Sequence, residues 1–249
     1  MIICCGEALI DMIPTTLDSG ETAFIPKIGG AILNTSICLG RLGADVGFLG
    51  AVSKDLFGEQ ILEELINSKV NTSFCLETSN NTTLAFAKIA NGTTTYSFFD
   101  GNSSNRTICL KDVVLDDNKV DTIYVGGISL MSEPNGTEIE NFIAKESSKK
   151  IVFYDPNVRP NFIEDRSLFI QRFEKILSQS DIIKISEEDL EWLYPDGSFE
   201  EIYKQWLNLG LSIIVLTKGS EGAIIKTKNY EVTSRGEKVE VVDTIGAGD

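Results

Sequence analysis

Short runs of apolar, mostly β-branched residues recur along the 249-residue chain. They lack the strict polar alternation of a half-exposed strand, so they predict strands that are buried on both faces of a sheet. The runs are Ile2–Cys5, Val46–Val52, Thr122–Val125, Ile151–Tyr154, Ile182–Ile185 and Ser212–Thr217.

Segments with helical spacing of apolar residues lie between these runs. Two of them end at a glycine, Gly43 and Gly210, and a glycine just past the last turn is a common helix stop. Buried strands that alternate with helices predict an α/β fold, with a mainly parallel central sheet and helices on both faces. The predicted helices are Ala31–Leu42, Gly58–Ser68, Gly136–Ser147, Ser167–Ser178 and Phe199–Leu209.

Two stretches in the first half of the chain, residues 12–28 and 83–100, break this alternation with short segments and turn signals. Leu84–Ala90 and Thr95–Phe99 flank Asn91-Gly92, a dipeptide typical of tight hairpins, so they predict a β-hairpin. We expect the two stretches to pair into a small separate sheet. The rest of residues 1–249 is expected to form a single α/β domain.

The composition excludes several classes of function. The net charge is −15, and an acidic surface repels the phosphate backbone, so we expect no nucleic-acid partner. The chain contains no histidine, which excludes Ser-His-Asp and Cys-His catalysis as well as His-ligated zinc. Acid–base chemistry therefore falls to the remaining titratable side chains.

The cysteines and the apolar runs predict a reduced protein in the cytoplasm. There are five cysteines, an odd number without CxxC spacing, and Cys4 and Cys5 lie inside an apolar run as expected of buried thiols. No apolar run approaches the roughly 18 residues of a membrane-spanning helix. Met1-Ile2-Ile3 lacks the basic start of a signal peptide.

The last four residues, Gly246-Ala247-Gly248-Asp249, follow an apolar run that starts at Val239. Consecutive backbone N–H groups in such a turn form an anion site when a helix follows, and an aspartate at its edge can accept a proton. Two alternatives remain at this point: a flexible polar tail, or the first half of a dinucleotide-binding glycine motif.

Two more glycine pairs have both a structural and a functional interpretation. Thr217 and Gly219–Gly222 read as a hairpin turn, or as a nucleotide contact where a parallel strand ends. Gly29-Gly30 with Asn34 reads as a turn and helix cap, or as a place where ligand hydroxyls approach bare backbone. Asp11 is likewise a turn residue or an acceptor for a pair of sugar hydroxyls.

Charged residues follow two further predicted strands. Asp155-Pro-Asn-Val-Arg159-Pro160 is a loop stiffened by two prolines, and Arg159 can clamp a transferring phosphate. Glu187-Glu188-Asp189 has the composition of the first turn of a helix, where acidic residues favour the helix dipole. No Walker A motif and no protein-kinase loop signature occurs, so any ATP site has another architecture.

Taken in order, these motifs resemble the ribokinase-like, or PfkB, carbohydrate kinases, and the resemblance covers the whole chain. Each motif is modest alone, but the ordered set is specific. The matching segments are Cys5-Gly-Glu-Ala-Leu-Ile-Asp11, Gly29-Gly30 with Asn34, Leu39-Gly-Arg-Leu-Gly43, Asp55-Leu-Phe-Gly58 and Asp243-Thr-Ile-Gly-Ala-Gly-Asp249.

The resemblance implies a ribokinase-like fold in which the two irregular stretches form a β-lid over the sugar. It implies an ATP- and Mg²⁺-dependent kinase, in some members with K⁺, and allows a homodimer through the lid. Asp249 would be the general base, and Gly246, Ala247 and Gly248 the anion hole. The other implied contacts are Asp11, Gly29, Gly30, Asn34, Phe99 and Arg159 for the sugar; Lys184, Ser186, Thr217, Gly219 and Gly222 for the nucleotide; Asp189 for magnesium; and Asp243 and Thr244 for a monovalent cation.

Two departures from the family pattern stand out. The family's NxxE element aligns with Ser186-Glu-Glu-Asp189, and this Ser/acid version preceded by Lys184 is similar to fructokinases. The family also continues past GAGD for several helices, so we expect a C-terminal part to be missing. A truncated, inactive homologue that binds sugar without turnover is therefore an alternative to an active kinase.

Within the family, the motifs favour fructokinase, which implies phosphorylation of fructose to fructose 6-phosphate. The supporting segments are Gly6–Met12, Gly29–Thr35 and Asp155–Pro160. The competing assignment is 2-keto-3-deoxygluconate kinase, which usually has an arginine for the substrate carboxylate near Asp100. The aspartate found there is expected to repel an acid sugar.

Overall fold

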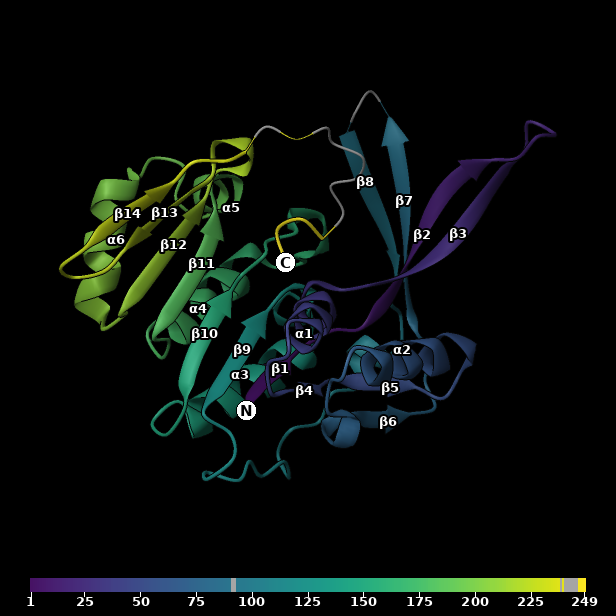
Figure 1. Ribbon diagram of the computed structural model, residues 1–249, viewed down its shortest axis with the longest axis horizontal. Helices are drawn as coiled ribbons and strands as arrows, with labels where there is room; N and C mark the ends of the chain where they lie inside the picture. Colours follow the sequence, from purple (N-terminus) through teal and green to yellow (C-terminus); the bar gives the residue numbers. More distant parts are fainter. Residues whose placement is uncertain (91–92, 238, 240–245) are drawn as a thin grey trace.

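The computed structural model describes residues 1–90, 93–237, 239 and 246–249 (Figure 1). Its centre is an eight-stranded sheet of order β14-β13-β12-β11-β10-β9-β1-β4, parallel from β12 to β4 and antiparallel at the β13–β14 edge. The mainly parallel sheet predicted from the buried runs is thus confirmed. Its strands are β1 (Ile2–Cys5), β4 (Val46–Leu49), β9 (Thr122–Gly126), β10 (Ile151–Asp155), β11 (Ile182–Ser186), β12 (Ile213–Thr217), β13 (Ala223–Lys226) and β14 (Glu231–Ser234).

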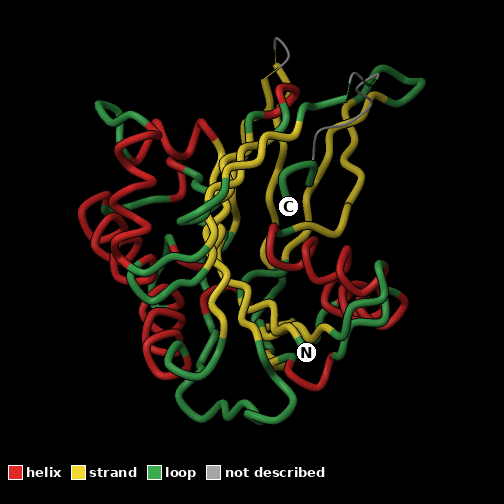
Figure 2. Tube along the Cα trace, turned by 60° about the vertical axis from the view of Figure 1, so that its left-hand side comes forward, coloured by secondary structure: helices red, strands yellow, loops and turns green. Residues whose placement is uncertain are grey.

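Helices cover both faces of this sheet, as the alternating pattern predicts (Figure 2). Helices α3, α4, α5 and α6 pack on one face around Tyr154, Phe173 and Trp206, all almost fully buried. Helices α1 and α2 pack on the other face, over β1, β4 and β9. The helices are α1 (Ala31–Arg41), α2 (Leu56–Asn67), α3 (Asn135–Glu146), α4 (Arg166–Leu177), α5 (Glu187–Leu193) and α6 (Phe199–Leu209).

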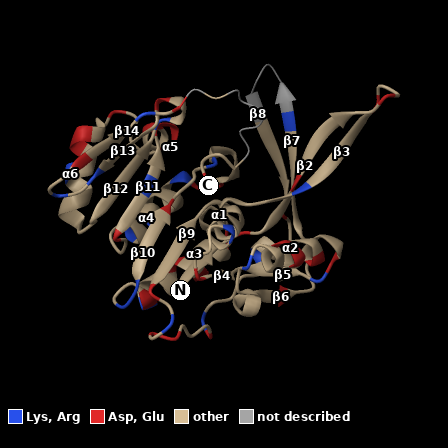
Figure 3. Ribbon diagram, in the orientation of Figure 1, with Lys and Arg blue, Asp and Glu red and all other residues tan. Residues whose placement is uncertain are grey.

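The second face is only partly covered. Along β11, Ile183 and Ile185 are buried, whereas Ile182, Lys184 and Ser186 on the opposite face are half-buried. Beyond the reach of α1, the face that carries Lys184 therefore stays accessible from solvent. Acidic residues are spread over helices and loops around the molecule (Figure 3). In the described part of the chain, no helix is both long and apolar enough to span a membrane.

The two irregular stretches form the separate sheet that the sequence predicts, rising from the main domain (Figure 1). Its order is β3-β2-β7-β8, so the β2–β3 and β7–β8 hairpins join along β2 and β7. The turn expected at Asn91-Gly92 lies outside the described residues, and the expected homodimer through this lid stays a prediction. The lid strands are β2 (Leu9–Thr16), β3 (Thr22–Gly29), β7 (Thr83–Ala90) and β8 (Thr93–Phe99).

One predicted strand was wrong in extent. The run Val46–Val52 is divided at Gly50, where an added Cβ would lie 2.3 Å from the carbonyl oxygen of Gly6. The chain bends at this close approach, leaves the main sheet and pairs elsewhere. The second half is β5 (Ala51–Ser53), which pairs in parallel with β6 (Leu76–Thr78).

The motif Asp55-Leu-Phe-Gly58 joins the main domain to the base of the lid. Asp55 caps α2 by accepting N–H bonds from Phe57 and Gly58, at 3.1 and 2.8 Å. The same carboxylate accepts the N–H and hydroxyl of Thr82, both at 2.7 Å, immediately before β7. Glycine is required at 58 because a Cβ there would lie 1.9 Å from the Ser53 carbonyl oxygen.

Candidate active site

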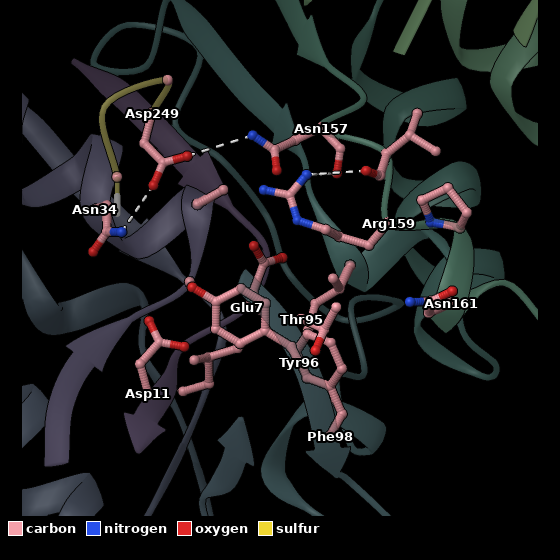
Figure 4. Close-up of a pocket in the computed structure, with 18 of the residues that line it drawn as sticks. Glu7, Asp11, Asn34, Thr95, Tyr96, Phe98, Asn157, Arg159, Asn161 and Asp249 are labelled. Atoms are coloured by element: carbon pink, nitrogen blue, oxygen red, sulfur yellow. Dashed lines mark hydrogen bonds between the residues drawn. The ribbon is translucent and has the colours of Figure 1, made fainter. Parts of the chain in front are cut away.

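A cavity of about 530 Å³ lies where the carboxyl ends of the parallel strands meet the lid (Figure 4). This edge of a parallel sheet is where ligands bind in open α/β folds. The cavity is lined by Glu7, Leu9, Asp11, Gly30, Ala31, Asn34, Thr95, Tyr96, Phe98, Ile128, Asn157, Val158, Arg159, Pro160, Asn161, Glu188, Gly246, Gly248 and Asp249.

Asp249 is held in the cavity wall by two amides from distant parts of the chain (Figure 4). Asn34 Nδ2, on the first turn of α1, donates to Asp249 Oδ2 at 2.8 Å. Asn157 Nδ2, in the loop after β10, donates to Asp249 Oδ1 at 3.4 Å. Asn157 has a left-handed φ of 42°, a conformation that asparagine tolerates better than most residues. Both carboxylate oxygens of Asp249 are thereby oriented as acceptors.

Asp11 lies in β2, at the root of the lid, rather than in a turn after the first strand. Burial raises its pKa to about 6, the charge of Asp249 adds to this increase, and the guanidinium of Arg159 opposes it. Gly29 lies behind it: an added Cβ would come within 2.1 Å of Asp11 Oδ2. Gly29 is not part of the cavity lining, so its contribution is space for this carboxylate.

Glu7 is a cavity residue that the sequence reasoning missed. It is 1% exposed, and its carboxylate accepts the Ile32 N–H at 3.4 Å and the Ser129 N–H and hydroxyl at 3.2 and 2.6 Å. Burial raises its pKa, and these hydrogen bonds oppose the increase. The absence of a side chain at Gly127 leaves space for this carboxylate, because a Cβ there would lie 2.2 Å from Glu7 Oε1. Its place in the motif before Asp11 was the available signal.

The lid contributes Phe98 to the cavity lining, whereas Phe99, the residue expected to contact the sugar, does not line it. Phe98 packs on Phe162 with 4.9 Å between ring centroids, whereas Phe99 is 63% exposed and packs on Phe86 on the other face of the lid. Successive side chains of a strand point to opposite faces, so a choice between neighbours depends on register, which the sequence did not determine.

Asp100, the residue expected to repel an acid sugar, lies outside the cavity lining. Asp100 Oδ2 accepts from Arg106 Nε at 2.6 Å, and the ion pair stands outside the cavity lining. Among the described residues, the charges that line the cavity are four carboxylates and the guanidinium of Arg159. Arg159 Nη1 donates to its own backbone neighbour, the Val158 carbonyl, at 2.9 Å.

The expected magnesium residue is placed away from the cavity. Ser186 caps α5 by accepting the Asp189 N–H at 3.1 Å, and the Asp189 carboxylate accepts a backbone N–H from Val158 in the neighbouring loop. Burial raises the pKa of Asp189 to about 6, and the nearby charge of Asp155 adds to the increase. Glu188, one residue earlier, is the carboxylate of this turn that lines the cavity.

The remaining nucleotide residues lie on the neighbouring strands. Lys184 forms an ion pair with Asp155, and Thr217 stands at the carboxyl end of β12. Gly219 and Gly222 do form a β12–β13 hairpin, with φ values of 53° and 102° that favour glycine. These residues do not line the cavity, so a nucleotide contact there stays a prediction.

The chain end forms a turn in which the Asp249 N–H donates to the Gly246 carbonyl at 3.1 Å. Gly246 has a φ of 73°, and Gly246 and Gly248 line the cavity whereas Ala247 does not. The cation residues expected at Asp243 and Thr244 lie outside the described residues.

Comparison with known proteins identifies the class. The profile of the family described as "pfkB family carbohydrate kinase" matches residues 1–249. The chain therefore belongs to the pfkB family of carbohydrate kinases, and its class is that of the ATP-dependent sugar kinases.

Several proteins that are similar to this chain are fructokinases. A fructokinase of Rhizobium leguminosarum bv. trifolii is 42% identical over 249 residues, which cover all of this chain and 76% of the relative. Among solved structures, a Xylella fastidiosa fructokinase with bound ATP aligns with a TM-score of 0.89 at 24% identity, over 99% of this chain and 77% of that one. A Vibrio cholerae fructokinase with fructose, ADP and calcium aligns with a TM-score of 0.81 at 22% identity, over 99% and 79%. The two structural likenesses establish the ribokinase-like fold.

Proposed function

We propose that the protein transfers the terminal phosphoryl group of ATP to fructose and forms fructose 6-phosphate. The observation that carries this proposal is the placement of Asp249, held by Asn34 and Asn157 in a cavity that also contains Asp11 and Arg159. The 42% identical fructokinase supports the choice of sugar.

The residues divide the reaction between them. Asp11 accepts hydrogen bonds from sugar hydroxyls, and Asp249 accepts the proton of the attacking hydroxyl as its oxygen bonds to the γ-phosphorus. The bond between that phosphorus and the bridging oxygen breaks, and ADP leaves with the electron pair. The backbone amides of Gly246–Gly248 and the guanidinium of Arg159 stabilise charge on the transferring group.

The positive groups at this edge of the sheet fit a nucleotide phosphate chain. Arg159 lines the cavity, Lys184 lies on the open face of the sheet, and the glycine turn adds backbone amides. Among the described residues, no group of three or more acidic or cysteine side chains could hold a metal ion. Mg²⁺ would bind together with ATP and neutralise phosphate charge. Of the cavity carboxylates, Glu188 is the nearest in sequence to Asp189, the residue expected to contact magnesium.

We expect fructose to be preferred over 2-keto-3-deoxygluconate by kcat/KM. In the described part of the cavity wall, the carboxylates of Glu7, Asp11, Glu188 and Asp249 outnumber the guanidinium of Arg159, so a substrate carboxylate meets net repulsion. A coupled ADP-release assay over ketoses, aldoses, sugar acids and nucleosides measures this directly.

Asp100→Asn is the control for that assay. It removes the lid carboxylate that pairs with Arg106, and it should leave the ratio of the two kcat/KM values unchanged. A higher kcat/KM for the acid sugar would overturn the choice of fructose. Fructose binding without ADP release from any sugar would favour the sugar-binding homologue instead.

We further expect the KM for fructose to rise as the pH falls through about 6. The folded-state pKa of Asp11 is raised to about 6, so its carboxylate, the form that accepts two hydroxyl bonds, is lost below that pH. For a group with that pKa, roughly a tenth of the carboxylate remains at pH 5, so KM should be about ten-fold higher there than at pH 8. In Asp11→Asn the pH dependence should be absent; if it persists, another group is responsible.

A further inference from the structure

Asp155, at the carboxyl end of β10, is a buried acid that the proposed reaction does not use. It is 1% exposed, and a single oxygen, Oδ2, accepts both the Lys184 ammonium at 2.5 Å and the Tyr124 hydroxyl at 3.0 Å. These donors come from β11 and β9, the strands on either side of β10. Asp155 thus joins three adjacent strands below the cavity.

Tyr124 also connects Asp155 to helix α1, which carries Asn34, a hydrogen-bond partner of Asp249. The Tyr124 hydroxyl lies 3.4 Å from Thr35 Oγ1, and Thr35 follows Asn34 on α1. Burial raises the pKa of Tyr124, and the charge of Asp155 adds to this, so the hydroxyl stays protonated and donates a hydrogen bond to Asp155. The carboxylate is therefore oriented from one side by Tyr124 while it holds Lys184 on the other.

Lys184 needs such a partner. Its side chain is 18% exposed and reaches over the partly covered face of the sheet on a flexible four-carbon stem. Without a fixed acceptor, the Lys184 ammonium would be hydrated and would move among several positions. Burial raises the pKa of Asp155, whereas the ammonium of Lys184 and the hydrogen bonds oppose this, as expected of an acid whose charged form is paired.

We propose that Asp155 is a positioning residue for the nucleotide half of the site: it fixes the Lys184 ammonium where the phosphate chain of ATP passes Asp249. The inference rests on the proposed function for its ligand. Asp155 does not line the cavity, so it acts through Lys184 and not on the reacting atoms. The charge of Asp155 adds to the raised pKa of Asp189, and the charge of Asp249 adds to the raised pKa of Asp155.

Calorimetry with the non-hydrolysable β,γ-methylene analogue of ATP tests this in the full-length protein. Asp155→Asn and Lys184→Met should each raise the Kd of the analogue by roughly 10- to 100-fold, the loss expected for one hydrogen bond to a charged group. The double variant should be no weaker than either single one, because both changes remove the same interaction. The Kd of fructose should stay within about two-fold, since the sugar contacts are unaltered.

Lys226→Met is the matched control. Lys226 is a lysine on β13 with a 4% exposed side chain that pairs with Glu200 and Glu231, and it is aligned with Ile214, three residues before the strand end at Thr217. Its loss should lower the thermal unfolding midpoint and leave the analogue Kd unchanged.

Three results would overturn the inference: an unchanged Kd in Asp155→Asn, a lower Kd, which would make Asp155 a competitor of phosphate, or additive losses in the double variant. If Asp155→Asn does not fold, Lys184→Met must still raise the Kd. A wild-type protein that binds the analogue and fails to phosphorylate fructose would contradict the proposed function alone, because this test depends on binding.

Discussion

Replacement of Asp249 by asparagine should lower kcat for fructose phosphorylation by about 10²–10⁴-fold, the usual contribution of a general base. The amide cannot accept the hydroxyl proton, and one of its two positions would present an NH₂ group to Asn34 or Asn157, both of which now donate to this side chain. Steady-state kinetics in a coupled ADP-release assay gives the change.

Fructose affinity should stay within a few-fold in the same variant, because Asp11 and the other sugar contacts remain. Calorimetry with fructose checks this, and it also shows that the variant is folded. Asp100→Asn serves as the matched control, since it removes an ion-paired carboxylate outside the cavity and should keep wild-type kcat. Retention of a tenth of the wild-type kcat by Asp249→Asn would exclude Asp249 as the base.

Replacement of Asp11 by alanine should weaken fructose binding by about 100-fold or more. Two hydrogen bonds from hydroxyls to a carboxylate are each worth about 1.5–3 kcal/mol, and a buried, partly desolvated carboxylate lies at the strong end of that range. We expect the loss in KM and in the calorimetric Kd for fructose, whereas the Kd for an ATP analogue should change little.

Gly29→Ala provides an independent check on Asp11. Its Cβ would stand 2.1 Å from Asp11 Oδ2, so it should displace the carboxylate without removing it. We expect weaker fructose binding in this variant too. Normal fructose affinity in both variants would mean that Asp11 does not bind the sugar.

The strand-end rule explains why much of the cavity could be predicted. Asp11, Asn34 and Arg159 each follow or flank a predicted strand or glycine turn, and the carboxyl ends of parallel strands meet at one edge. Together with the ordered motifs, this rule was enough to group residues that are far apart in the chain. The parallel order of the main sheet places Asn34 and Arg159 at this edge, and Asp11 reaches the cavity from the lid strand β2.

The direction in which a side chain points could not be predicted from the sequence. Phe98 and Phe99 are equally apolar, and only the pairing of Ala85 with Phe98 turns Phe98 inward with the buried Ala85. Glu188 and Asp189 are both acidic, but in the folded chain Asp189 bonds the backbone of Val158 in the neighbouring loop, whereas Glu188 lines the cavity. In each pair, a shift of the element by one residue would replace the side chain that lines the cavity with its neighbour. Composition cannot reveal which of the two lines the cavity.

The sequence by itself determined the class of fold, most element positions and the separate lid, because hydrophobic periodicity and glycine stops are local signals. It also determined the family, since motif order is a property of the chain. The tertiary structure alone decided the partners of charged groups: Lys184 with Asp155, Asp100 with Arg106, and Asp249 with Asn34 and Asn157. These pairings join residues that are distant in sequence or compete for several partners, and which one forms depends on burial and on distances that exist only once the sheet, helix α1 and the lid have packed together.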